Sequence, residues 1–265
     1  MPNFTKCAAM IRANALPALF LVFVVATAQA AYAQTNNTMD DIRERGAFVI
    51  GADVPYGVMQ FLDENGDLTG IDIEIANRIS KDLNAELVVK MMPFDQLFGA
   101  LANDQIDAVV SAVTITQERQ KTMLFSVPYM DAGMSIAVSA DNTEIKGIND
   151  LVDKRVGVLR GTVGETLMSQ TEFVSSDLMF SYESNDKRIA DLISGELDAI
   201  VAHFASDAVP NVRFVEPPLT QSFYGVAVRL DDTALMSSIN ATLRDMKRSG
   251  DIDRIKQTFL GSDAP

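Results

Sequence analysis

Apolar runs and amphipathic stretches alternate in a regular order through the first half of the chain. Residues 47–53, 86–91 and 106–113 are short apolar runs rich in Val and Ile, the pattern of buried strands. Residues 71–83 and 94–104 place their apolar side chains on one helical face. Strands and helices that alternate over short connections are typical of a parallel sheet with helices on both faces. We therefore predict one such α/β unit here.

The same order begins again in the second half. Strands are predicted at 155–161, 178–184 and 197–202, with helices at 162–170 and 185–196 between them. Two α/β units in series predict two lobes. Open α/β sheets bind ligands beyond the carboxyl ends of their strands, so a ligand is expected in a cleft between the lobes.

The last elements of the chain indicate how the lobes are connected. The terminal helical stretches pack most naturally on the first lobe, so the chain crosses between lobes twice. Extended strands near 134–139 and 223–229 are predicted to make the crossings and to act as a hinge. We place the first lobe at residues 34–134 and 224–265 and the second at 135–223.

The first 33 residues have the pattern of an export signal. Lys6 and Arg12 flank a short polar start, the apolar run 13–28 follows, and two Ala-x-Ala triplets occupy 28–33. The run is shorter than the ~20 residues that span a bilayer, which favours cleavage over a membrane anchor. We predict a cleavable signal peptide at residues 1–33 and export to the periplasm.

Charge and residue counts exclude several classes of partner. The chain has 22 Lys and Arg against 36 Asp and Glu, a formal net charge of −14 that becomes −16 without the two cations of the signal. Nucleic acids and anionic membranes require a basic surface, so neither is an expected partner. Cys7 lies within the signal, and with a single histidine a structural zinc site is not expected. We predict an exported monomer without metal or cofactor.

The segment SAVTITQER, residues 111–119, is the strongest local indication of a binding site. It follows a buried strand and exposes the hydroxyls of Ser111, Thr114 and Thr116. A helical turn is predicted to start near Thr116, with Arg119 three residues on. Hydroxyls, a helix N-terminus and a guanidinium together make a receptor for a carboxylate. The alternative is that Thr116 caps the helix and Arg119 is solvated.

A similar turn, RGTVGE, recurs in the second lobe at residues 160–165. Gly161 and Gly164 allow the backbone to approach a ligand, and Thr162 is placed to cap the following helix. One Gly-rich turn is weak evidence. Two such turns, one in each lobe and both facing the predicted cleft, favour a ligand between them.

Four longer segments carry a resemblance to a known family: GADVPYG…FLDENGDLTGIDIEIA, FDQLFGALANDQIDAVVSAVTITQERQKTMLFSVPYMDAG, KRVGVLRGTVGET and GVAVRLDD…INATLRDMKRSGDIDRIKQTFLG. Over about residues 40–261 the chain resembles the periplasmic amino-acid-binding proteins of ABC importers, solute-binding family 3. The resemblance implies an α/β, two-lobe type II periplasmic-binding fold. It also implies capture of a free amino acid or related small carboxylate and delivery to an inner-membrane ABC permease.

The resemblance also assigns ligand contacts residue by residue. It implies these roles: Ser111, Thr114 and Arg119 hold the carboxylate, Thr162 adds a second-lobe contact, Tyr56 and Phe94 form apolar walls, and Asp53 helps bind the α-ammonium. Core packing is the alternative for Phe94. Asp72 also matches the family, and we interpret it as a helix-start residue and not as a ligand.

One departure from the family concerns the single histidine. The second-lobe acid that contacts the α-ammonium falls on His203, or on Asp207 if the alignment shifts. Either Asp53 holds the amino group with weak help from neutral His203, or the ligand lacks a free α-ammonium. We predict weakened affinity for ordinary L-amino acids and a dependence on pH near 6 to 7, about the range of an unperturbed histidine.

Two other functions use the same scaffold. The family has cyclohexadienyl dehydratase relatives, and Glu165 or His203 would be the candidate general acid of such an enzyme. A ligand sensor that acts through a separate receptor is the third possibility. The leading hypothesis is a binding protein with no catalytic residue.

Overall fold

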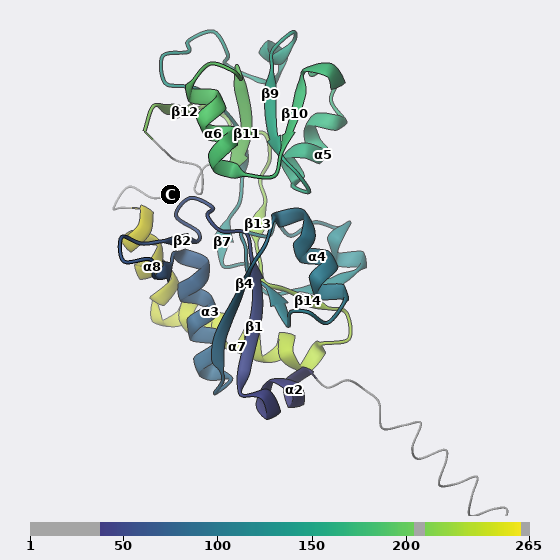
Figure 1. Ribbon diagram of the computed structural model, residues 1–265, viewed down its shortest axis with the longest axis vertical. Helices are drawn as coiled ribbons and strands as arrows, with labels where there is room; N and C mark the ends of the chain where they lie inside the picture. Colours follow the sequence, from purple (N-terminus) through teal and green to yellow (C-terminus); the bar gives the residue numbers. More distant parts are fainter. Residues whose placement is uncertain (1–37, 204–209, 261–265) are drawn as a thin grey trace, which may run out of the picture. The chain divides into compact units, whose positions relative to one another are not determined.

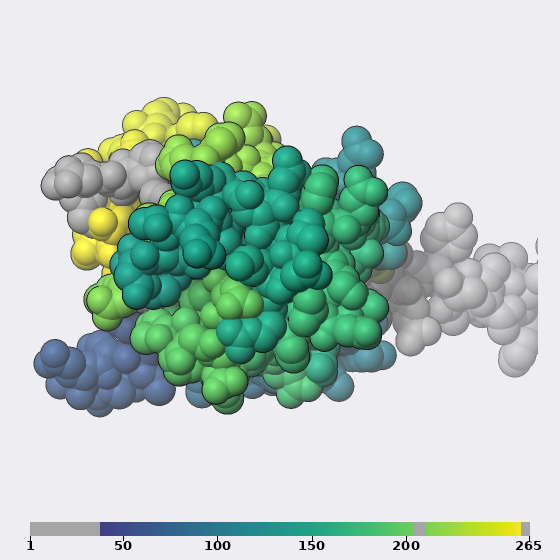
Figure 2. Space-filling model, turned by 90° about the horizontal axis from the view of Figure 1, so that it is seen from above, coloured from purple at the N-terminus to yellow at the C-terminus, as the bar shows by residue number. Residues whose placement is uncertain are grey.

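The computed structural model describes residues 38–203 and 210–260 (Figure 1). The predicted signal peptide at 1–33 and Asp207 lie outside the described residues. Two five-stranded sheets, each flanked by helices, form the two lobes, as predicted. The second-lobe residues, teal to green, fill the middle of the face seen from above, and first-lobe segments show around its margin (Figure 2).

The first-lobe sheet has the strand order β4-β1-β5-β14-β6. Its strands are β1 (Ala47–Ala52), β4 (Glu86–Met91), β5 (Ala108–Val109), β6 (Met123–Phe125) and β14 (Ala227–Arg229). Neighbours β4, β1 and β5 are parallel, and β14 runs antiparallel to both of its neighbours. Four of the five strands therefore share one direction.

The second-lobe sheet repeats this plan with the order β10-β9-β11-β8-β12. Its strands are β8 (Met134–Ser139), β9 (Val156–Leu159), β10 (Met179–Tyr182), β11 (Ala199–His203) and β12 (Val212–Phe214). Here β8 is the strand that runs against its two neighbours. The mostly parallel sheets predicted from the alternation of elements are thus confirmed in both lobes.

Helices cover the sheets, and short elements complete the chain. The helices are α2 (Thr38–Arg45), α3 (Ile71–Asp82), α4 (Phe94–Ala102), α5 (Val163–Ser169), α6 (Asn185–Ile193), α7 (Thr233–Ser249) and α8 (Asp251–Leu260). A hairpin of β2 (Phe61–Leu62) and β3 (Leu68–Thr69) precedes α3. Three 3₁₀ turns lie at Arg119–Lys121, Ile148–Leu151 and Ser176–Leu178.

Both faces of each sheet are buried. Along β1, Phe48 and Ile50 belong to one apolar cluster and Val49 to another, because successive strand side chains point to opposite faces. In β11, Val201 and Ile200 divide in the same way between two second-lobe clusters. This two-sided burial explains why the strands are continuous apolar runs in the sequence and do not alternate with polar residues.

The first crossing between the lobes differs from the prediction, and the second agrees with it only at its start. Residues 134–139 form β8 inside the second sheet, and 227–229 form β14 inside the first. The crossing segments are paired by two short antiparallel strands: β7 (Met130–Asp131), which precedes the predicted 134–139, and β13 (Phe223–Tyr224), which lies at the start of the predicted 223–229. A strand of five buried residues such as β8 gains more by pairing with β11 than by forming an isolated ribbon.

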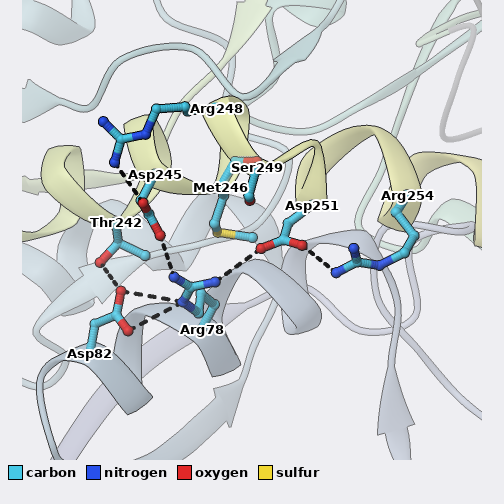
Figure 3. Close-up of polar contacts among 9 residues, drawn as sticks. All are labelled: Arg78, Asp82, Thr242, Asp245, Met246, Arg248, Ser249, Asp251 and Arg254. Carbon is cyan, nitrogen blue, oxygen red and sulfur yellow. Dashed lines mark hydrogen bonds and ion pairs between the residues drawn. The ribbon is translucent and has the colours of Figure 1, made fainter.

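An ion-pair network fixes the C-terminal helices to the first lobe, as predicted (Figure 3). From α3, Arg78 donates to Asp82 of the same helix, to Asp245 of α7 at 2.6 Å and to Asp251 of α8 at 3.0 Å. Thr242 of α7 donates to Asp82 Oδ2 at 2.8 Å, an oxygen that Arg78 also contacts. The network is partly exposed, so it specifies which helices meet more than it adds stability.

Candidate functional site

Residues from the carboxyl ends of strands in both sheets line one small cavity. The lining residues are Tyr56, Phe94, Ala112, Thr114, Arg119, Leu159, Thr162, Val163 and His203. Six of the eight residues predicted to bind the ligand are therefore brought together from the two lobes. The other two, Asp53 and Ser111, hydrogen-bond to each other beside the cavity, from Asp53 N to Ser111 Oγ at 2.9 Å.

Arg119 is the cation of the cavity. Its guanidinium lies over the rings of Phe98 and Phe94, 4.9 and 5.4 Å from their centroids. One nitrogen, Nη1, donates to the Thr114 carbonyl at 2.9 Å, and Nη2 donates across to the Gly161 carbonyl of the second lobe, also at 2.9 Å. Burial lowers the pKa of Arg119 to about 10, so the group stays charged at neutral pH.

The segment before Arg119 turns less regularly than the sequence predicts. The helical turn expected from Thr116 is a three-residue 3₁₀ turn that begins at Arg119. The Thr116 hydroxyl still accepts from Arg119 N, at 3.2 Å. A short cap of this kind keeps the guanidinium directed back toward the cavity.

A buried carboxylate holds the loop after β5. Asp72 is fully buried and accepts from Ala112 N at 2.6 Å and from the Tyr129 hydroxyl at 2.7 Å. Ala112 has φ of 46°, a left-handed conformation that a residue with a Cβ adopts at a cost. Burial raises the pKa of Asp72 to about 7, and its two hydrogen bonds act in the opposite direction.

Asp72 is therefore a positioning residue that sequence reasoning missed. It does occupy the start of α3, as predicted, and it is not among the cavity residues. Its side chain nevertheless supports the loop that carries Ser111 and Thr114. The signal available in the sequence was an acid between Ile71 and Ile73 on the buried face of a helix, where charge is costly without partners.

Gln60 is the second residue that sequence reasoning missed. Its side chain is completely buried, and Nε2 donates to the Asp53 carbonyl at 2.8 Å and to Ser111 Oγ at 2.9 Å. The turn from Tyr56 to Gln60, closed by a hydrogen bond from Tyr56 N to Gln60 O at 2.8 Å, brings it there. Nothing in the local pattern distinguished this glutamine from a surface residue.

Asp53 lies at the end of β1 with its carboxylate partly buried. Burial raises the pKa of Asp53 to about 6, a hydrogen bond from the Phe94 backbone N–H lowers it, and the charges of Asp95 and Asp186 raise it. Its Oδ2 atom is buried and accepts no hydrogen bond from the described residues. Asp53 directly follows the last residue of β1, where the sequence places it, and its role as a ligand contact stays a prediction.

In the second lobe, Thr162 caps α5 as predicted. Its hydroxyl donates to the Leu159 carbonyl at 2.6 Å and accepts from Glu165 N at 3.4 Å. Glu165 accepts from Gly161 N at 2.8 Å and from the Ser181 hydroxyl at 2.5 Å. Both side chains therefore stabilise the turn itself. Glu165 is not among the cavity residues, and its contacts are those of a structural acid at a helix start.

His203 ends β11 and lines the cavity. It is 4% exposed, its Nδ1 lies 3.1 Å from the Ala132 carbonyl, and its ring is 4.9 Å from that of Tyr224. A carbonyl only accepts, so Nδ1 carries the proton and Nε2 is an acceptor in the neutral ring.

The predicted titration of His203 near pH 6 to 7 is wrong. Burial lowers the pKa of His203 to about 3, and the positive charges of Arg188 and Arg119 lower it further. The Ala132 carbonyl opposes this shift but is outweighed. His203 is therefore neutral throughout the physiological range.

The lobes are closed on each other in this structure. The cavity between them has a volume of about 10 Å³, enough for one water at most. A Cβ on Gly161, whose φ is 75°, would lie 3.2 Å from both Cα and Cβ of Asp95, so the second-lobe turn sits directly on the start of α4. Ligand sites usually measure roughly 300–1,000 Å³, so the lobes must separate before a solute can enter.

A larger hollow of about 530 Å³ lies beside the crossing strands. It is lined by parts of β7 and β13, by Lys256 and Leu260 of α8, and by His203. Arg119 and the predicted carboxylate-binding residues are not part of its wall. The polar side chains of Thr114, Arg119 and Thr162 line the small cavity and not this hollow. The candidate site is therefore the small cavity, although the hollow is larger.

The described residues contain neither a metal-ligand cluster nor a membrane-spanning helix. Within 38–203 and 210–260, no three His, Cys, Asp or Glu side chains are grouped so as to hold a metal ion. No helix in these ranges has the length and hydropathy to span a bilayer.

A family model and a curated relative each match most of the length of this chain. A family model described as bacterial extracellular solute-binding proteins, family 3, matches residues 48–262. The L-cystine-binding protein TcyJ of Escherichia coli K12 is 28% identical, over 94% of this chain and 96% of its own length.

Two solved structures resemble the whole two-lobe body. The arginine-bound form of truncated ArgBP from T. maritima is 34% identical with a TM-score of 0.74, covering 78% of this chain and 99% of that one. An ancestral amino acid-binding protein, a precursor of cyclohexadienyl dehydratase, is 33% identical with a TM-score of 0.76, covering 84% and 99%. The type II periplasmic-binding fold expected from the sequence is confirmed.

Proposed function

This chain belongs to the bacterial extracellular solute-binding proteins, family 3, and from that membership we propose that it captures a free amino acid or closely related small carboxylate between its two lobes. The ligand carboxylate binds Arg119, with Ser111, Thr114 and the turn at Thr162 around it. Tyr56 and Phe94 form the apolar walls.

The guanidinium of Arg119 is the observation that carries this proposal. It is charged, half-buried and held on aromatic rings, with Nη2 directed at a carbonyl oxygen of the opposite lobe. A carboxylate oxygen is a stronger acceptor for this fork than a neutral carbonyl. When the lobes separate, the Gly161 contact is lost, and a carboxylate takes its place before they close again.

The amino group of the ligand binds Asp53, with His203 as a neutral acceptor from the second lobe. Asp53 has a buried oxygen without a donor among the described residues, and the Nε2 atom of His203 is an acceptor by elimination. One carboxylate and one neutral acceptor compensate an ammonium less well than two carboxylates. This arrangement favours weak binding of ordinary amino acids or preference for a ligand with a neutral N–H.

We further propose that the protein works in the periplasm, after removal of residues 1–33, as a monomer that delivers its ligand to an ABC permease. Opening and closing about the β7–β13 pair couples binding to delivery. The site acts by binding alone, because Glu165 is engaged in its own turn and His203 is neutral.

A ligand screen with a matched pair of variants tests the proposal. We expect L-arginine, L-cystine or L-pyroglutamate to raise the unfolding temperature, since a ligand at 100 times its Kd stabilises by about 2.7 kcal/mol. Arg119→Lys keeps the charge but removes the fork, and should abolish the shift. Arg160→Lys is the control, since Arg160 pairs with exposed Glu183. An unchanged shift in Arg119→Lys, or no shift in the wild type, contradicts the proposal.

A further inference from the structure

Three residues at the end of β1 form a closed hydrogen-bond cluster. Gln60 Nε2 bridges the Asp53 carbonyl at 2.8 Å and Ser111 Oγ at 2.9 Å. Asp53 N also donates to Ser111 Oγ, at 2.9 Å. Gln60 is fully buried and Ser111 is 1% exposed, so the cluster is shielded from solvent. The direction of each hydrogen bond in the cluster, that is, which group donates and which accepts, is therefore set by the protein and not by solvent.

The orientation of the Gln60 amide follows from its partners. The Asp53 carbonyl is purely an acceptor, so the NH₂ group must face it. The other end of the amide, Oε1, is buried and accepts no hydrogen bond from any described residue. A buried unpaired acceptor is unfavourable, and such groups concentrate where they serve a function. The protein thus keeps Nε2 between Asp53 and Ser111 at the expense of Oε1.

This orientation decides what Ser111 can do. A hydroxyl has two lone pairs and one proton. Both lone pairs of Ser111 Oγ already accept, one from Asp53 N and one from Gln60 Nε2. Its proton is donated to none of the described residues, and the neighbouring Ala112 lines the cavity. Ser111 is thereby left as a donor whose acceptor must come from outside the cluster.

We propose that Gln60 is a positioning and specificity-determining residue that commits the Ser111 hydroxyl to donate to the ligand carboxylate. The inference rests on the proposed function, since it requires a carboxylate at Arg119. An acceptor at position 60 reverses the polarity, because Ser111 then donates inward and turns a lone pair toward the ligand. Gln60 in this way selects an anionic group at this place in the cleft and rejects a hydrogen-bond donor.

The decisive variant is Gln60→Glu, which keeps the shape and removes the donor. With L-arginine, L-cystine and L-pyroglutamate as probes in titration calorimetry, we expect affinity for whichever binds the wild type to fall at least about tenfold. Gln96→Glu is the matched control, because Gln96 is exposed on α4 of the same lobe and its substitution introduces the same charge. It should stay within about twofold of the wild type.

A double-mutant cycle separates this role from simple charge repulsion or a packing defect. In a Ser111→Ala background, Gln60→Glu should cost less than about threefold, since the hydroxyl through which it acts is gone. Repulsion between the introduced carboxylate and the ligand, or a distorted loop, would instead persist with its full effect. A full additional loss in the Ser111→Ala background overturns the inference.

Two further measurements keep the outcome decisive. If Gln60→Glu does not fold, Gln60→Met removes the donor without a charge and is put through the same cycle. The Gln60 side-chain amide protons should be resolved and protected from exchange in ligand-free wild type, and one should shift in Ser111→Ala. Rapidly exchanging amide protons would overturn the inference without any ligand. A wild type that binds no probe, with protected amide protons, counts against the proposed function and not against the cluster.

Discussion

The two strand-to-helix turns that face each other across the cavity use their hydroxyls in opposite ways. In the second lobe, Thr162 donates to Leu159 O and accepts from Glu165 N, so its hydroxyl is satisfied within its own turn. In the first lobe, Ser111 accepts two N–H groups and donates to none of the residues described. The Thr162 hydroxyl is fully hydrogen-bonded within its own turn, whereas the Ser111 hydroxyl keeps a proton that it can donate to a ligand.

The difference indicates a division of labour between the lobes. The first-lobe loop is held in a left-handed conformation at Ala112 by buried Asp72, which fixes donors at the cavity before any ligand arrives. The second-lobe turn brings a capped helix and a carbonyl to close over the site. We therefore expect affinity to depend mainly on the first lobe, and second-lobe changes to act through stability and closure.

The largest effect should come from Arg119→Ala. It removes a charged fork that hydrogen-bonds the ligand, and hydrogen bonds to charged groups contribute about 1.5–3 kcal/mol each. Loss of two such bonds predicts at least about a hundredfold weaker binding in titration calorimetry. An Arg119→Ala protein that binds within tenfold of the wild type would remove the distinction between the lobes.

Asp72→Ala should have the next largest effect, on folding. The substitution leaves Ala112 N and the Tyr129 hydroxyl without their buried acceptor, at a cost of about 2–4 kcal/mol in the free energy of unfolding. Asp72→Asn keeps one acceptor and should lose about half as much. Urea unfolding measures both, and Asp245→Asn, on the exposed network, is the control.

The same carboxyl predicts how stability depends on pH. The pKa of Asp72 is raised to about 7 in the fold, above its unfolded value, so the native state binds more protons between about pH 4 and 7. Its contribution is fully present below about pH 4 and is lost as the pH rises through 7. The free energy of unfolding should change less with pH in Asp72→Asn than in the wild type over this range.

A smaller effect should appear in the pH dependence of binding. Because the pKa of Asp53 is raised to about 6, affinity for an amino acid should fall several-fold from pH 7.5 to 5.5 as the carboxylate is protonated. Asp53→Asn should bind weakly at both pH values and show no such fall. His203→Gln should keep the dependence, since His203 does not titrate in this range. If the pH dependence of binding disappears in His203→Gln, the titrating group is His203 and not Asp53.

The smallest effect on affinity is expected from Thr162→Ala. Loss of an N-cap costs about 1 kcal/mol of stability. Binding should change less than about threefold, because the hydroxyl is already engaged within its own turn. Comparing it with Ser111→Ala in one titration series sharpens the contrast between the two turns. A larger loss of affinity in Thr162→Ala than in Ser111→Ala would contradict the division of labour.

Much of the architecture could be read from the sequence. Strand and helix periods are local properties, so the two α/β units and the Thr162 cap were predictable. The first crossing strand was misplaced, because a buried apolar strand such as β8 and a crossing segment have the same local pattern. Whether such a segment pairs inside a sheet depends on partners far away in the chain.

The sequence by itself predicted two α/β lobes with Thr114, Arg119 and Thr162 at the ends of strands that face one cleft, because strand ends and helix starts follow from local periodicity. His203 was placed there by the resemblance to the family. Only the tertiary structure decided which of the groups at the site are protonated and which hydrogen bonds they make. Burial keeps His203 neutral, Asp72 reaches a backbone N–H 40 residues away, and Gln60 fixes the polarity of a serine 51 residues away. Desolvation and hydrogen-bond partners come from packing between distant segments, and no local pattern encodes them.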